Sequence, residues 1–149
     1  MIKELYPFVQ AYAFIIGLAV GSFLNVIIYR VPNNKSIVKP RSKCTGCETQ
    51  ISWYDNIPVL SYVLLLGKCR NCKASISVRY PLIEFICGLM TVMLLSIYGI
   101  SYEFFVIVLF CYMLIAITFI DIDKKLNLFT IQPLKPIDYV VSRCSLVLF

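Results

Sequence analysis

Four of the seven cysteines form two C-x-x-C pairs, Cys44 with Cys47 and Cys69 with Cys72, separated by residues 48–68. A turn of this kind brings two thiolates to one tetrahedral zinc ion, and a second turn completes the coordination shell. Because all four ligands would be protein thiolates, no position stays open for water or substrate. The spacing therefore predicts a structural zinc, whose binding energy would fold a polar loop.

The alternative for these cysteines is redox chemistry, with two dithiols that form disulfides. A catalytic C-x-x-C usually accompanies a βαβ pattern, which this sequence lacks. Disulfides are also rare in the reducing cytoplasm, where the charge distribution described below places these residues. Zinc is favoured, and a membrane dithiol redox protein is the alternative. Gly46 and Asn71 suit the two turns because both residue types tolerate positive φ.

Histidine is absent, which excludes histidine-based catalysis and leaves acid–base chemistry to other side chains. Asp121 follows an uninterrupted apolar run, and an ionisable group at membrane depth is a functional-site hypothesis. The alternative is an ordinary helix-end charge paired with Lys124 or Lys125. On a helix, Asp123 would point about 200° away from Asp121, so these two carboxylates cannot face each other.

Glu84 is a second candidate polar group of the site. It lies at the start of another apolar run. Its ordinary role would be an ion pair with Arg79 or Arg30.

Small and polar residues recur every four positions in the first apolar run, at Ala13, Gly17, Gly21 and Asn25. This spacing places them along one stripe of a helix. Small residues let a second helix approach closely, and an asparagine adds an interhelical hydrogen bond. The stripe therefore predicts helix packing, and the alternative is substrate contact by Asn25 or Ser22.

The elements that position these residues are membrane helices. Sixty per cent of the 149 residues are hydrophobic and 15% are charged, whereas soluble domains average about 45–50% and 25%. Uncharged runs cover residues 5–29, 85–102 and 104–120, with lengths of 25, 18 and 17 residues, and a span needs roughly 17–25. We predict an all-α membrane protein with three transmembrane helices, at 5–29, 82–100 and 104–121.

The first two spans enclose a polar segment, residues 30–80, which we expect to form a small zinc-ribbon-like domain. Residues 51–54 and 63–66 would be short strands or turns packed beside the zinc. The segment has nine basic and two acidic residues, a net charge of +7. A Lys/Arg excess in a loop of this length places it in the cytoplasm and the N-terminus outside. The charge also attracts anionic lipid heads, whereas nothing here indicates nucleic-acid binding.

Three segments of the sequence resemble the bacterial type IV prepilin peptidases, the aspartic peptidases of family A24. They are GLAVGSFLNVIIYRVP (17–32), ISWYDNIPVLSY (51–62) and GKCRNCKASISVRYPLIEF (67–85). The segments follow one another in the family's order, and the resemblance covers residues 8 to about 123.

The resemblance implies an aspartic endopeptidase in the bacterial cytoplasmic membrane. Such an enzyme removes the short basic leader from prepilins and pseudopilins at the cytoplasmic face. Many members also methylate the new N-terminus with S-adenosylmethionine. The family's first catalytic aspartate follows a span in an Ile-Asp context, which Asp121 matches.

The second catalytic aspartate of the family lies in a Gly-x-Gly-Asp motif, which this sequence lacks because no glycine follows Gly99. Residues 126–149 also diverge from the family pattern. We therefore expect a C-terminally truncated or frameshifted copy that is inactive without its missing half. The alternatives are the dithiol redox protein and a non-enzymatic zinc-binding membrane module that packs against a partner's helices.

Overall fold

The computed structural model describes residues 2–44 and 46–131, with side chains described for 5–44 and 46–125. Its elements are helical throughout this part of the chain: α1 (Ile2–Arg30), η1 (Val31–Asn33), η2 (Trp53–Asn56), α2 (Leu60–Leu64), α3 (Arg79–Tyr98) and α4 (Tyr102–Ile131). The predicted all-α class is confirmed.

Three of these helices are long and apolar enough to cross a membrane, over Leu5–Asn33, Arg79–Tyr98 and Tyr102–Lys125. They begin and end close to the uncharged runs of the sequence. Charged residues extend them at several ends, because long polar side chains there can reach the membrane interface.

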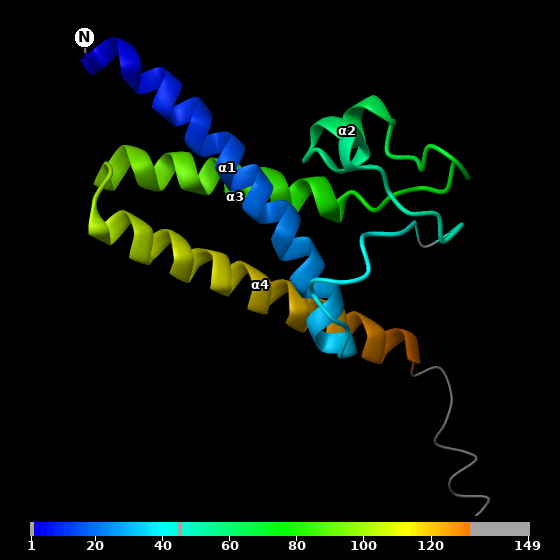
Figure 1. Ribbon diagram of the computed structural model, residues 1–149. Helices are drawn as coiled ribbons and strands as arrows, with labels where there is room; N and C mark the ends of the chain where they lie inside the picture. The colour runs from blue at the N-terminus through cyan, green and yellow to red at the C-terminus, as the bar shows by residue number, and fades with distance from the viewer. Residues whose placement is uncertain (1, 45, 132–149) are drawn as a thin grey trace, which may run out of the picture.

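The helices α3 and α4 form an antiparallel hairpin, and α1 crosses both of them (Figure 1). Gly99 ends α3 with a φ of 63°, a conformation that few other residues adopt without strain. Buried residues of all three helices form one apolar cluster that includes Ile28, Ile83 and Tyr112. Much of the remaining apolar surface faces outward, as expected for helices surrounded by lipid.

The stripe on α1 faces α3 along its length. Ala13 belongs to a buried cluster with Leu95, and the Asn25 side chain donates a 3.0 Å hydrogen bond to the Tyr80 carbonyl. Between them, a Cβ added to Gly17 would lie 2.8 Å from the Cys87 carbonyl oxygen. There is no room for such an atom, because the backbone of a packed helix cannot move aside as a side chain can.

The partner of this stripe is therefore α3 of the same chain. A separate protein would have to dock on another surface.

The loop between α1 and α3 contains helical turns where we expected short strands or turns. Residues 51–54 lead into η2, and residues 63–66 overlap the end of α2. Among the described residues, strand-like pairing is limited to two isolated bridges, Lys43 with Gln50 and Lys68 with Ser75. Short apolar runs do not distinguish strands from helical turns by periodicity, so the sequence left both open, and the structure has the turns.

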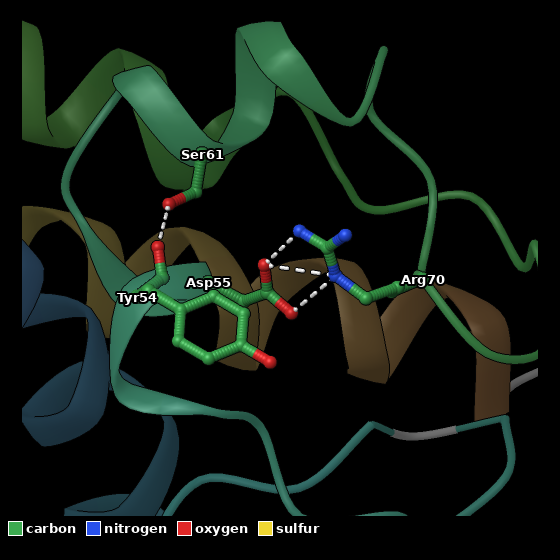
Figure 2. Close-up of polar contacts among 4 residues, drawn as sticks. All are labelled: Tyr54, Asp55, Ser61 and Arg70. Atoms are coloured by element: carbon green, nitrogen blue, oxygen red, sulfur yellow. Dashed lines mark hydrogen bonds and ion pairs between the residues drawn. The ribbon is translucent and has the colours of Figure 1, made fainter.

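An ion pair and a hydrogen bond fasten the parts of this loop together (Figure 2). The Arg70 guanidinium donates to both carboxylate oxygens of Asp55, from Nη2 at 2.6 Å and from Nε at 2.9 Å. The Ser61 hydroxyl donates to the Tyr54 carbonyl at 2.9 Å. The first contact joins η2 to the second C-x-x-C turn, and the second joins η2 to α2.

Candidate metal centre and catalytic aspartate

The four predicted zinc ligands, Cys44, Cys47, Cys69 and Cys72, lie together and are called the four-cysteine cluster below. Their sulfur atoms are all within 4.8 Å of one another, and the Sγ atoms of Cys44 and Cys72 are 3.7 Å apart. In a tetrahedral zinc site, with each sulfur about 2.3 Å from the ion, neighbouring sulfurs are about 3.8 Å apart. The cluster therefore fits one four-coordinate zinc ion. All four thiols are free of disulfides.

The two C-x-x-C turns have the same backbone geometry. Cys44 N–H donates to the Thr49 carbonyl, and Cys69 N–H donates to the Ala74 carbonyl, each five residues on. The positive φ values fall on the residue four after each first cysteine, Glu48 at 54° and Lys73 at 59°. Asn71, whose residue type suits such a position, does not have a positive φ. Each turn is thus a closed loop of six residues rather than a tight turn centred between its cysteines.

Hydrogen bonds from the loop favour thiolates at two of the ligands. The side chain and backbone of Thr49 lower the pKa of Cys47 to about 6, and the backbone N–H groups of Cys72 and Asn71 lower the pKa of Cys69. The Ala74 N–H favours a thiolate at Cys72 as well, but desolvation and the other three sulfurs raise its pKa to about 11. A bound dication would offset this repulsion and hold all four sulfurs deprotonated.

A cavity of about 410 Å³ adjoins the cluster, between the loop and the first residues of α3. Residues that line it include Cys44, Cys69, Tyr54, Arg70 and Tyr80. Its volume lies in the range typical of small-molecule sites.

Asp121 lies on α4 with its side chain exposed. Within the described side chains it has no ion-pair partner, so neither Lys124 nor Lys125 neutralises it. Asp123, by contrast, pairs with Arg79 at the start of α3. The two carboxylates therefore face different surroundings, as the helical period predicts. The ion pair joins the ends of α3 and α4 on the side of the loop.

Glu84 is buried and does not pair with either predicted arginine. Its Oε2 accepts a 2.7 Å hydrogen bond from the backbone N–H of Val59. Arg79 is held by Asp123, and Arg30 donates to two backbone carbonyls of the loop, at residues 36 and 40. The predicted ion pair of Glu84 with Arg79 or Arg30 is therefore wrong, because both arginine side chains bind other acceptors.

Comparison with known proteins decides the family. Residues 15–98 match the Bacterial Peptidase A24 N-terminal domain, which covers more than half of the chain. The chain belongs to this peptidase family. Its three apolar helices and this membership make it an integral inner-membrane protein.

Relatives of the chain have the names that the resemblance implied. The prepilin leader peptidase/N-methyltransferase of Myxococcus xanthus is 45% identical over 78% of the chain and 35% of its own length. That of Neisseria gonorrhoeae is 38% identical over 83% of the chain and 52% of its own length. A "type 4 prepilin-like proteins leader peptide-processing enzyme" of Escherichia coli is 36% identical over 73% of the chain and 47% of its own length.

The chain thus spans about a third to a half of the length of these relatives. No solved structure matches it. The A24 N-terminal domain match includes the four-cysteine cluster and Glu84 and most of the stripe, whereas Asp121 lies beyond it.

Sequence reasoning missed three features of the site: the Arg79–Asp123 pair, the Asp55–Arg70 pair and the Val59–Glu84 hydrogen bond. The first two join oppositely charged residues, but many such pairs were possible among the 14 basic and 8 acidic residues. The third uses a backbone donor, which leaves no signal in the sequence.

Proposed function

We propose that this chain contributes to a prepilin leader peptidase that cleaves the basic leader of prepilins or pseudopilins at the cytoplasmic face of the inner membrane. The observation that carries the proposal is the 34–45% identity to enzymes with this name, over about three quarters of the chain. Asp121, which follows the third apolar run in an Ile-Asp context, is the proposed first catalytic aspartate.

Aspartic peptidase chemistry requires two carboxyl groups. One is ionised and activates water, and the other is protonated and polarises the scissile carbonyl. Asp123 is unsuited to the second role, because it is paired with Arg79 and points away from Asp121. The second carboxylate is therefore proposed to come from a segment with a Gly-x-Gly-Asp motif, outside these 149 residues.

The four-cysteine cluster is proposed to hold a structural zinc. A zinc ion with four thiolate ligands keeps no open position, so it would fold the loop and take no part in hydrolysis. Cys44, Cys47, Cys69 and Cys72 would hold it.

A second activity, methylation of the new N-terminus, would require S-adenosylmethionine as the methyl donor. The 410 Å³ cavity beside the four-cysteine cluster is the proposed place for this cofactor. Tyr54 and Tyr80 line it and offer aromatic surface for an adenine ring.

Leader removal from a prepilin, by membranes of a host with no prepilin peptidase of its own, tests the proposal. Membranes with this chain alone should leave the prepilin unprocessed. Co-expression of a family C-terminal half with the Gly-x-Gly-Asp motif should restore processing. Asp121→Asn should then reduce the rate by at least about 10²–10⁴-fold, whereas the exposed carboxylate variant Glu103→Gln should not.

Efficient processing by the chain alone would contradict the requirement for a second aspartate from elsewhere. Restored processing that survives Asp121→Asn would contradict the catalytic role of Asp121.

A further inference from the structure

A half-enclosed cavity of about 160 Å³ lies where the loop covers the ends of α1 and α3. Its volume is several times the roughly 30 Å³ that one water molecule occupies in the liquid. Ser22 and Asn25 of α1 and Glu84 of α3 are among the polar residues that line it. The loop residues that line it include Ser61 and Tyr62 of α2, the short helix labelled in Figure 1. The cavity is separate from the four-cysteine cluster, because no cysteine lines it.

Asn25, one of the residues that line the cavity, has an unsatisfied acceptor. Its side chain is 5% exposed, its Nδ2 donates to the Tyr80 carbonyl, and its Oδ1 is buried with no hydrogen-bond partner. The orientation of the amide is fixed, since a flip would place Oδ1 against the Tyr80 carbonyl oxygen. A buried acceptor without a donor is destabilising by about 1–3 kcal/mol, so such groups usually have a partner when the protein works.

Glu84 adds a carboxylate that has a hydrogen bond but no countercharge. The residue is 8% exposed, and the Val59 N–H is its hydrogen-bond donor. Val59 itself has a φ of 57°, which is strained for a β-branched residue. Within the described side chains, the ion pairs are Arg70–Asp55 and Arg79–Asp123, and neither includes Glu84.

From these groups we infer that the cavity binds a primary ammonium group of a peptide. The ammonium carries three N–H donors, and acceptor groups among the residues that line the cavity include the Glu84 carboxylate, the Ser22 hydroxyl and the Asn25 amide oxygen. Its positive charge supplies the countercharge that a buried carboxylate requires. A divalent metal fits less well, since calcium and magnesium take six or more oxygen ligands. The second carboxylate of the lining, Asp55, is already bound to Arg70.

The inference rests on the proposed function in one respect: it takes the bound peptide to be a prepilin. A prepilin offers this chemistry in two places: the α-amino group that leader cleavage exposes, and the lysine side chains of a basic leader. Both present the same donors, so the experiment must separate them.

Binding can be measured by calorimetry on the full chain in lipid nanodiscs, with Asp121→Asn present so that nothing is cleaved. Three apolar hexapeptides serve as probes: one with a free N-terminus and no lysine, one acetylated with a single lysine, and one acetylated without lysine. Magnesium chloride alone is the fourth probe. Glu84→Gln keeps an acceptor for Val59 N–H but removes the charge, Asn25→Leu removes the amide oxygen, and Glu103→Gln is the matched control.

We expect a peptide with an ammonium group to bind at least about tenfold more tightly than the doubly blocked peptide, as for other charge-assisted hydrogen bonds. Glu84→Gln should weaken that binding about 10- to 100-fold, which is the usual range for such a bond. Asn25→Leu should also weaken it, and Glu103→Gln should leave it unchanged. Preference for the free N-terminus identifies the cleaved pilin as the source, and preference for the lysine peptide identifies the leader.

Four results would each overturn the inference. The first is equal binding of all three peptides, and the second is binding that survives Glu84→Gln in a chain with unchanged helical circular dichroism. The others are binding of magnesium only and no binding of any probe. None of these results depends on leader cleavage. Failure of the proposed function would appear in the processing assay instead, while ammonium binding persisted.

Discussion

The thiolates of the four-cysteine cluster differ in how readily they form. The loop stabilises thiolates at Cys47 and Cys69, whereas the proton of Cys72 is held by the proximity of the other sulfurs. A metal that displaces this last proton would bind with proton release, and its affinity would fall as the pH falls. At the scale of single residues, a metal held by the four-cysteine cluster would therefore bind in competition with protons.

We expect one zinc ion per chain in metal-replete protein, measured by elemental analysis and thiol counting. Cys47→Ser should lose most of the zinc and increase proteolysis of the loop, because a ligand is removed. Cys111→Ser, within α4, should keep the zinc. Zinc absent while the four thiols are paired as disulfides in cells would support the redox alternative instead.

The Asp55–Arg70 pair should stabilise the loop in a pH-dependent manner. Hydrogen bonding by Arg70 holds the pKa of Asp55 below its ordinary value. A depressed folded-state pKa gives stability that is present above the unfolded pKa of about 3.9 and is lost as the pH falls below it. Asp55→Asn should therefore speed amide hydrogen exchange around η2 at neutral pH, and the difference from the unaltered chain should shrink below about pH 4.

The stabilisation by the Asp55–Arg70 pair should be small, as for other surface ion pairs, since Arg70 is 56% exposed and solvent screens the interaction. Glu48→Gln is the matched control, because Glu48 is an exposed acid of the same loop. Equal exchange in Asp55→Asn and Glu48→Gln would show that the pair contributes nothing.

Residue spacing predicted the four-cysteine cluster and the opposed directions of Asp121 and Asp123, because both follow from local geometry. It did not predict the left-handed conformation of Glu48 and Lys73, which the closure of each six-residue loop imposes. It also did not predict the contact of Glu84, because a backbone N–H is present at nearly every position. Partners that are set by tertiary packing leave little trace in one sequence.

At the scale of elements, the contact between α1 and α3 depends on the absence of side chains. A Cβ at Gly17 would meet backbone atoms of Cys87 and Gly88 at 2.8 Å. A Cβ at Gly88 would meet the ring of Phe14 at 2.7 Å and the end of Leu18 at 3.1 Å. Side-chain ends can move, whereas the backbone of a packed helix cannot, so the two glycines should differ in tolerance.

Gly17→Ala should destabilise the helix packing by about 1–3 kcal/mol, the usual range for overpacking. Gly88→Ala should cost less. Thermal unfolding in detergent, followed by circular dichroism, measures both. Helix propensity favours alanine over glycine by about 1 kcal/mol, so a loss of stability at Gly17 would reflect the contact alone. Equal stability of the two variants would contradict this account of the α1–α3 contact.

The long helices were predictable because a membrane requires an apolar run of minimum length, which a sequence displays directly. The short helical turns of the loop were not, because η2 and α2 contain only four and five residues. Segments of that size take their conformation from the contacts around them.

At the scale of the whole molecule, the charge distribution determines orientation. The loop of residues 30–80 has a net charge of +7, which predicts a cytoplasmic loop and an external hairpin tip at Glu103. In a background with Cys87, Cys111 and Cys144 replaced, Ser36→Cys should resist impermeant thiol reagents in intact cells, and Glu103→Cys should react. The background chain, which keeps its four-cysteine cluster, is the control for reactivity of the cluster itself. The reverse labelling would place Asp121 on the wrong face for leader cleavage.

The stripe on α1 also determines how the molecule adapts to membranes of different thickness. From Ala13 to Asn25 it follows α3 for about 18 Å, at about 1.5 Å per residue. A slide of α1 along α3 would move Gly17 away from the backbone of Cys87 and Gly88 and bring bulkier parts of α1 toward it. The two helices therefore cannot shift past each other to shorten the apolar span. In a thinner bilayer we therefore expect the helices to tilt together or the lipids to deform.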